Sequence, residues 1–166
     1  MIYLLDADTL IRADNTYYRL KRFPVFWQWL YHNGAAGIVK IPMEQYEEIV
    51  AGKGELVDWL KEQEHKEALL FAEEANPQLV AFVTTNGYAG DLNAAELVTV
   101  GRDPFLIAYG LTAANERCVV SFETSAPAKQ RANRKVPDVC ASLNVKCATL
   151  FQVIEDLDFT TDWRPS

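Results

Sequence analysis

Four short apolar runs are spaced along the chain, and each has the pattern of a buried strand. Residues 2–5 (Ile-Tyr-Leu-Leu) form a continuous apolar run that ends at Asp6, which is typical of a strand in a parallel sheet. Comparable runs at 37–41, 117–122 and 145–148 predict three further strands. We therefore expect a sheet whose strands lie far apart in the sequence.

Helix signals separate these runs. Proline at a first helical position, or apolar residues spaced three and four apart, predicts the helices. They are expected at 24–32, 42–51, 54–75, Asp103 to Leu111, a short stretch from Val136, and Leu150 to Leu157. The segment 77–100 is ambiguous between strand and helix, and 124–135 is expected to be an open basic loop. Strands that alternate with helices predict an α/β fold with a mostly parallel central sheet of four to five strands.

The composition is that of a soluble globular protein. At 166 residues the chain can bury a core, and we expect a single domain over residues 1–166. No apolar run is long enough to cross a membrane, so no membrane partner is expected. The first residues lack a basic lead and a cleavage motif, so we expect no signal peptide. Cys118, Cys140 and Cys147 form no CxxC pair, which favours a reducing compartment such as the cytoplasm.

The negative charge is concentrated in one stretch. The formal net charge is −7, and residues 44–75 alone account for it with ten acids against three lysines. Two basic clusters lie outside this stretch, Arg19-Lys21-Arg22 and Lys129-Arg131-Arg134-Lys135. A surface for nucleic acid is therefore expected to be local.

Acidic residues recur where the predicted strands end. Ligands of open α/β sheets bind beyond the carboxyl ends of the strands. The acids expected near that edge are Asp6, Asp8, Glu44, Glu47, Glu48, Asp103 and Glu123. Converging carboxylates repel one another, and a divalent cation is the simplest way to neutralise them. Mg²⁺ takes carboxylate oxygens, water and substrate phosphates as ligands, so a phosphodiester is a plausible substrate class.

Four motifs, in order along the chain, resemble those of PIN-domain ribonucleases. They are Leu4–Ile11, Ile41–Ile49, Gly101–Ala108 and Val119–Glu123. Two further segments, Asn15-Thr16-Tyr17-Tyr18 and Lys135-Val136-Pro137-Asp138-Val139-Cys140, resemble an uncharacterised PIN-like branch related to VapC-type toxins.

The resemblance implies a three-layer α/β/α sandwich and an Mg²⁺- or Mn²⁺-dependent endoribonuclease that acts on RNA, with a preference for single strands. It implies catalytic roles for Asp6, Glu48, Asp103 and Glu123. Metal ligands would come from Asp6, Asp103, Glu123, Asp8 and Asp138, and substrate contacts from Ser121, Lys129, Arg131, Arg134 and Lys135. Asp8 stands where Asn is more common and Glu123 where Asp is usual. The basic insertion is also longer than usual, so Asp138 is the alternative fourth carboxylate.

Each of these residues also has a structural interpretation. Glu48 lies in an acidic helix whose charges can simply face solvent. Asp103 before Pro104 suits a helix cap. Glu123 can be an ordinary loop acid, and Asp138 a helix-start acid stabilised by the helix dipole. The basic loop can serve solubility alone. Trp27 and Trp29 are expected in the core, whereas Tyr17 and Tyr18 are candidates for stacking on bases.

Three functions remain open from the sequence. The first is the nuclease, which by family analogy can be the toxin of a toxin–antitoxin pair with an antitoxin protein as partner. The second is a phosphatase of the haloacid dehalogenase type with Asp6 as nucleophile, although Leu10 stands where that motif needs Thr. The third is a non-catalytic PIN-like binding module. A homodimer is also expected, formed through aromatic residues near 17–29.

Overall fold

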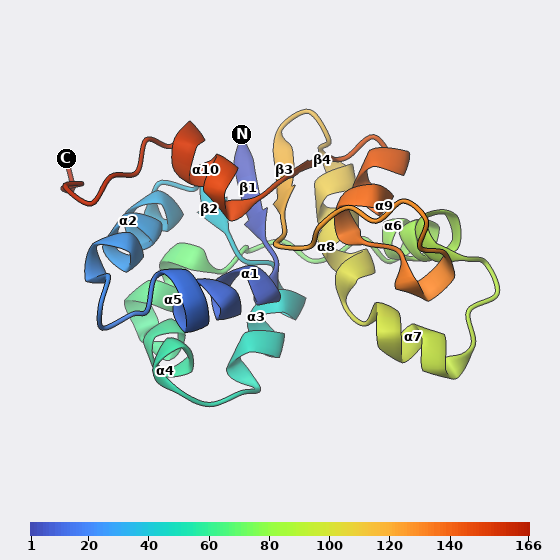
Figure 1. The fold of residues 1–166 in the computed structure, drawn as a ribbon, viewed down its shortest axis with the longest axis horizontal. Helices are drawn as coiled ribbons and strands as arrows, with labels where there is room; N and C mark the ends of the chain where they lie inside the picture. The colour runs from blue at the N-terminus through green and yellow to red at the C-terminus, as the bar shows by residue number, and fades with distance from the viewer.

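A four-stranded, fully parallel sheet forms the centre of the computed structural model, which describes residues 1–166 (Figure 1). The strands are β1 (Ile2–Leu5), β2 (Val39–Lys40), β3 (Arg117–Val120) and β4 (Lys146–Ala148), in the spatial order β2-β1-β3-β4. All three pairings are parallel, so every carboxyl end meets the same edge of the sheet. The α/β class and the parallel sheet expected from the sequence are confirmed.

Helices cover both faces of the sheet and give a three-layer α/β/α arrangement. The α-helices are α1 (Ala7–Arg12), α2 (Pro24–Ala35), α3 (Met43–Val50), α4 (Glu55–Lys61), α5 (Gln63–Leu69), α6 (Pro77–Phe82), α7 (Ala94–Val100), α8 (Asp103–Thr112), α9 (Val136–Ser142) and α10 (Leu150–Asp156). Two wide π-type turns, η1 (Ala13–Tyr17) and η2 (Val83–Tyr88), and a short 3₁₀ turn, η3 (Arg131–Asn133), complete the elements. None of the helices has the length and apolar character needed to cross a membrane.

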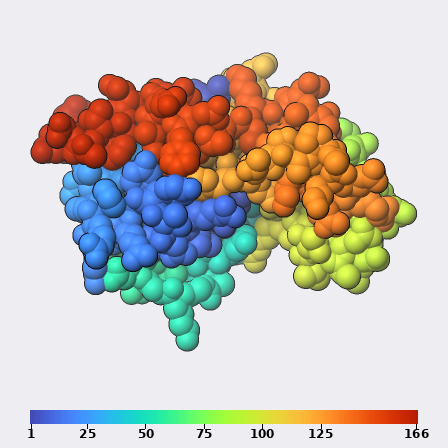
Figure 2. All heavy atoms as spheres, in the orientation of Figure 1, coloured from blue at the N-terminus to red at the C-terminus, as the bar shows by residue number.

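The central strands send alternate side chains into two separate cores, because successive side chains of a strand point to opposite faces. Tyr3 and Leu5 of β1 enter the first core, which α1 to α5 and α10 cover. Leu4 enters the second core, under η2, α8 and α9. Figure 1 shows the two helix sets on either side of the sheet, and Figure 2 shows a hollow between their blue-green and yellow-green surfaces.

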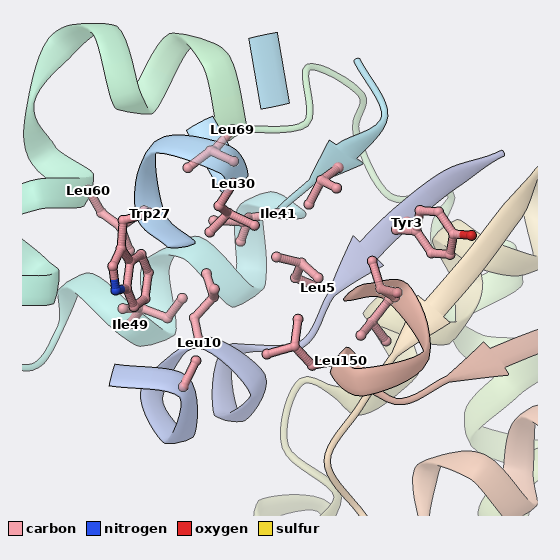
Figure 3. Packing of buried hydrophobic residues seen from close by; sticks show 14 of the residues in the cluster. Tyr3, Leu5, Leu10, Trp27, Leu30, Ile41, Ile49, Leu60, Leu69 and Leu150 are labelled. Atoms are coloured by element: carbon pink, nitrogen blue, oxygen red, sulfur yellow. The ribbon is translucent and has the colours of Figure 1, made fainter. Parts of the chain in front are cut away.

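The first core is rich in large aromatic and aliphatic side chains. Trp27 and Leu30 of α2 pack toward Ile49 of α3 and Leu60 of α4, and Leu150 of α10 closes the group (Figure 3). Trp29 is also almost fully buried. The expectation that the two tryptophans of α2 belong to the core, rather than to a binding surface, is confirmed.

The expected helix over 54–75 is interrupted. The backbone leaves the helical conformation at Glu62 (φ −59°, ψ 133°), which divides the segment into α4 and α5. Beyond α5, Leu70 forms a parallel bridge with Ile41, and the Phe71 amide donates to the Ile41 carbonyl at 2.9 Å. Residues after Leu69 thus leave the helix because their backbone groups form hydrogen bonds with the outer edge of β2. The local sequence pattern does not predict these bonds.

The structure defines two regions that the sequence pattern left open, the segment 77–100 and the residues directly after β1. The ambiguous segment 77–100 forms α6, η2 and α7 and contributes no strand. Helix α1 follows β1 directly, although the apolar pattern alone did not predict it. Both regions adjoin the carboxyl edge of the sheet, because α1 begins at the tip of β1 and η2 ends at Tyr88, which lies near Asp103, Glu123 and Asp6.

Candidate functional site

Asp6 lies directly at the carboxyl end of β1. The Asp6 amide donates to the Val120 carbonyl of β3 at 3.0 Å. The Asp6 carbonyl accepts from the Thr9 amide, and this bond lies in the first turn of α1. The Thr9 hydroxyl also donates to Val120. The Asp6 side chain does not cap α1. The hydrogen bonds of this turn are therefore made by backbone groups and by Thr9, and they do not involve the Asp6 carboxylate. Asp6 as a residue is only 7% exposed.

Ser121 links Asp6 to the loop that follows β3. Its hydroxyl lies 3.4 Å from an Asp6 carboxylate oxygen and accepts from the Glu123 amide at 3.1 Å. Ser121 is buried, and its amide donates to Ala148 of β4, so its position is set by the sheet. The residue expected to contact substrate is thus placed between two of the predicted acids.

Asp103 is the first residue of α8, and its carboxylate receives no hydrogen bond in the structure. The capping residue of α8 is Arg102, so the interpretation of Asp103 as a helix cap is not supported. The Arg102 guanidinium donates to the Glu44 carbonyl at 2.6 Å, and the Gln45 side chain donates to the Arg102 carbonyl at 3.1 Å. These bonds fasten the start of α8 to α3 and so place Asp103 relative to the acids of α3.

Glu47 and Glu48 are neighbours on α3 with different surroundings. Glu47 forms an ion pair with Arg102 at 3.0 Å, on the side where α3 meets α8. Glu48 is exposed and has no ion pair or hydrogen bond, yet its charge is one of the causes that raise the pKa of both Asp6 and Asp103. Glu48, rather than Glu47, therefore faces the predicted site.

Asp6 and Asp103 share an acidic environment. Burial raises the pKa of Asp6 to about 7, with further increases from the charges of Glu48, Asp8 and Glu123. Burial likewise raises the pKa of Asp103 to about 8, followed by the charges of Asp6 and the same two glutamates, while Lys135 lowers it. The charge of Asp6 is thus among the causes of the raised pKa of Asp103, and the charges of Glu48 and Glu123 act on both carboxyls. The group holds more negative charge than its surroundings stabilise.

The structure separates Glu123 from Asp138 as candidates for the fourth carboxylate. Glu123 accepts from the Val136 amide at 2.6 Å and lies 3.5 Å from the Lys135 ammonium, and its charge acts on Asp6 and Asp103. Asp138 instead accepts from the Ser125 hydroxyl and from the Ala126 amide, and these bonds lower its pKa. Asp138 fixes the loop after β3 and does not join the acids.

Asp8 lies at the rim of the group. It is half-buried and forms an ion pair with Arg12, one helical turn later, at 2.7 Å. Its charge still raises the pKa of Asp6. Asp8 is thus close enough to add negative potential, although its carboxylate is already paired.

The basic loop contributes two lysines to the site. A cavity of about 150 Å³ is lined by Asp103 and Glu123 on one side and by Lys129 and Lys135 on the other. The Lys129 ammonium has no carboxylate partner. The two lysines that line this open cavity could bind an anionic phosphate group.

The two arginines expected to bind substrate have structural partners instead. Arg131 forms ion pairs with Asp91 at 2.8 Å and with Glu96 at 2.9 Å, which join the loop to α7. Arg134 lines the cavity, but its guanidinium donates to the carbonyls of Gly87 and Asp138. The structure thus brings the two lysines to the acids and engages both arginines in holding the loop.

Tyr88 is a residue near the acids that the sequence did not single out. It ends η2 and is 7% exposed, and its buried hydroxyl has no hydrogen-bond partner. Burial raises its pKa, and the charges of Asp103, Glu123 and Asp6 raise it further. A buried hydroxyl without a partner is costly, and a group bound at the site could accept its hydrogen bond. No motif marks Tyr88, since it lies in the ambiguous segment.

The spacing of the acids fits a hydrated cation better than a cation enclosed by protein ligands. In this structure only Glu62, Glu64 and His65 bring three ligand atoms within 4.8 Å of one another. Two of these are exposed, and His65 is stacked on Trp59 at 4.0 Å, so this group is explained by packing and solvent exposure. The acids around Asp6 do not bring three ligand atoms that close together, and Mg²⁺ usually keeps several waters beside one or two carboxylates.

The fold and the acid edge together define an α/β protein with an acidic site at the carboxyl ends of its parallel strands. The chain belongs to a family described as a domain of unknown function, DUF4411, whose model matches residues 3–161. No curated protein and no solved structure matches the chain. The family spans both cores and every acid of the site, but its description names no activity.

Proposed function

We propose that this protein is a divalent-cation-dependent endoribonuclease, with its site formed by Asp6, Glu48, Asp103 and Glu123. The observation that carries the proposal is the convergence of these acids on one sheet edge without enough cationic partners. Asp6 and Asp103 have no basic side chain in hydrogen-bond contact, although both come from well-fixed turns. A cation is the simplest partner for them, and Mg²⁺ or Mn²⁺ suits an all-oxygen set.

The protein's own groups have distinct tasks in such a reaction. A bound cation would activate water and stabilise charge on the phosphodiester. Asp6 and Asp103 would hold it, while Glu48 and Glu123 orient water at the rim. Ser121 keeps Asp6 and Glu123 in register through its hydroxyl. Lys129 and Lys135 offer positive charge to the substrate phosphate across the cavity.

The nuclease is favoured over the phosphatase and the binding module by specific residues. Leu10, which occupies the place of the phosphatase threonine, is fully buried in the first core and cannot serve a phosphate. A binding module would not need a buried carboxyl and a half-buried one, Asp6 and Asp103, without a basic partner, because such groups reduce stability. The proposal includes membership of the PIN-like superfamily, a cytoplasmic location, a homodimer and, for a toxin, an antitoxin partner.

The experiment compares cleavage of a labelled RNA by the purified protein with Mn²⁺, with Mg²⁺ and with EDTA. We expect cleavage only with a cation, and a loss of at least about 100-fold in Asp6→Asn, because a direct ligand should matter at least as much as residues that orient ligands. Asp58→Asn is the matched control, since Asp58 is an exposed acid of α4. Equal cleavage by wild type and Asp6→Asn would reject the proposal. A covalent aspartyl phosphate on Asp6 would support the phosphatase instead.

A further inference from the structure

An exposed group of aromatic rings lies on the first-core side of the acids. The rings of Tyr17 and Phe122 stack with centroids 5.5 Å apart and planes at 13°. Phe151 of α10 meets both rings edge to face, at 5.0 Å from Tyr17 and 5.5 Å from Phe122. Tyr17 is 44% exposed and Phe151 is 40% exposed, so this aromatic group (Tyr17, Phe122 and Phe151) presents ring surface to solvent.

The aromatic group is tied to the acids through the backbone after β3. Phe122 stands between Ser121, which contacts Asp6, and Glu123. Since side chains of extended backbone alternate in direction, Phe122 turns toward the first core while its two neighbours turn toward the acids. The rings therefore lie beside the site, joined to it through the backbone at Phe122.

Two cavities meet at Glu123 and differ in chemistry. The cavity that holds Lys129 and Lys135 lies on one side. On the other side, a cavity of about 300 Å³ is lined by Phe122, Glu123, Ser121, Thr149 and Gln152. One cavity thus offers positive charge, and the other offers the Phe122 ring with hydroxyl and amide groups nearby. Tyr17 and Phe151 contact Phe122 outside the lining of that cavity. A nucleotide has the matching division, with an anionic phosphate and a flat base whose edge forms hydrogen bonds.

We propose that Tyr17 and Phe151, supported by Phe122, form a stacking site for an unpaired nucleobase next to the scissile phosphate. This inference rests on the proposed nuclease function and adds a binding site to it. In a duplex the faces of the bases are covered by their neighbours, so the site takes a base from a single strand. Every base has a π-face, so the site contributes affinity and register with little sequence preference.

The test measures binding without cleavage, in the Asp6→Asn background with Mg²⁺. The probes are a fluorescein-labelled single-stranded RNA 12-mer and an abasic ribose-phosphate 12-mer. Their affinities are measured by fluorescence anisotropy. Tyr17→Leu and Phe151→Leu keep apolar bulk without the ring, Tyr17→Phe keeps the ring, and Phe82→Leu is the matched control because Phe82 is 45% exposed on α6. Thermal unfolding of each variant verifies that it is folded.

We expect the Leu variants at 17 and 151 to weaken binding of the base-bearing RNA by roughly 5- to 100-fold, the usual range for loss of one stacked base. Tyr17→Phe and Phe82→Leu should change it by less than about twofold, and the abasic probe should not distinguish the variants. Equal losses on both probes, no losses, or no binding of either probe by the parent protein would overturn the inference. It would also be overturned if the Leu variants changed only self-association in sedimentation, since the rings would then serve a second copy of the chain.

The outcomes separate the inference from the proposed function. Cation-dependent cleavage by the wild type with unchanged RNA binding in the Leu variants would remove the stacking site and leave the nuclease intact. Ring-dependent binding of the base-bearing RNA without any cleavage by the wild type would remove the nuclease and leave the stacking site.

Discussion

The two faces of the sheet are stabilised in different ways. The first core is closed by aromatic packing, in which Phe26 contacts Trp27 and Trp29 at centroid distances of 5.2 and 5.5 Å. The second core contains polar groups inside or along its boundary. Tyr88 has its buried hydroxyl there, and Arg117 is buried, with one guanidinium nitrogen donating to both carboxylate oxygens of Glu73 at 2.7 and 2.8 Å.

The difference shows how the acidic site is divided between the two sides. The first side supplies Asp6 and Glu48 on short, well-packed elements. The second side supplies Asp103 and the loop that ends at Lys135, which hydrogen bonds and ion pairs hold in place. Arg102 joins the two sides through its bonds to α3. The first side therefore holds its acids through hydrophobic packing, and the second side holds its charged residues through hydrogen bonds and ion pairs.

The largest expected effect tests whether both sides are needed. Asp103→Asn should reduce Mn²⁺-dependent RNA cleavage by at least about 100-fold, as a direct ligand would. Glu48→Gln, from the other side, should reduce it by roughly tenfold or more, because Glu48 acts at the rim. Glu64→Gln serves as the control, since Glu64 is an exposed helical acid of α5. Initial rates at saturating RNA provide the measurement. If only one of the two site variants lost activity, a single side would hold the whole site.

The second prediction concerns the stability of the cation-free protein as pH changes. Carboxyls with raised pKa in the folded state favour folding fully below their unfolded pKa near 4, and that contribution is lost as pH rises through the folded values of about 7 and 8 for Asp6 and Asp103. The free energy of unfolding in EDTA should therefore fall by several kcal/mol at most between pH 5 and pH 8. The fall would be seen as a lower urea midpoint.

The Asp6→Asn/Asp103→Asn double variant provides the comparison for that pH series. Its urea midpoint should depend less on pH, because the two titrating groups are gone. Mn²⁺ should restore stability to the wild type at pH 8 and have little effect on the double variant. Parallel pH curves for the two proteins would mean that these carboxyls do not titrate as described.

The third prediction uses one glycine from each side. A Cβ at Gly34 would lie 2.6 Å from Leu69 Cδ2, and one at Gly87 would lie 2.6 Å from Val139 Cγ1. Each Gly→Ala change should cost about 1–3 kcal/mol of unfolding free energy, because a packed core must shift to admit the methyl group. Denaturant unfolding measures the cost. Gly90→Ala is the control, since its nearest contact would be an ordinary 3.4 Å.

The activity of the glycine variants sharpens the comparison. Gly87 precedes Tyr88 and its carbonyl accepts from Arg134, so Gly87→Ala should also lower the rate of RNA cleavage. Gly34→Ala should leave the rate nearly unchanged at temperatures where the protein is folded. Equal effects of the two variants on the cleavage rate would show that the sides do not differ in their support of the site.

The smallest expected effect concerns Arg131. This side chain is exposed and paired with Asp91 and Glu96, so Arg131→Gln should change RNA affinity by less than about twofold and the unfolding midpoint only slightly. Lys129→Gln should weaken RNA binding measurably, because its ammonium is free beside the acids. Salt dependence of the RNA affinity separates the two, and a larger loss in Arg131→Gln than in Lys129→Gln would contradict the assignment.

The sequence predicts the elements that depend on local patterns. The apolar run before Asp6, the prolines that open α2 and α8, and the run of β3 all lie where the pattern places them. The alternation of strands and helices predicts a mostly parallel sheet, but it does not predict the strand order β2-β1-β3-β4. The end of α5 after Leu69 was not predictable, because it depends on the edge of β2, which is distant in sequence.

The site follows the same division. Asp6, Asp103 and Glu123 could be proposed from strand ends and helix starts, and the structure brings them together. The pairing of Asp138 with Ser125 and of Arg131 with Asp91 could not, since each depends on how a long loop folds back. Tyr88 was missed for the same reason, because its place near the acids depends on the packing of η2 between α8 and α9.

The central position of β1 has a consequence for the order of events during synthesis. Ile2 pairs with Arg117, so the strand that carries Asp6 gains its principal neighbour only after about two thirds of the chain has been made. At a translation rate of roughly 5–20 residues per second, that delay is on the order of ten seconds. During this interval Asp6 and Asp103 have no common edge to occupy. A chain with this topology can therefore assemble its acidic edge only after β3 has been made.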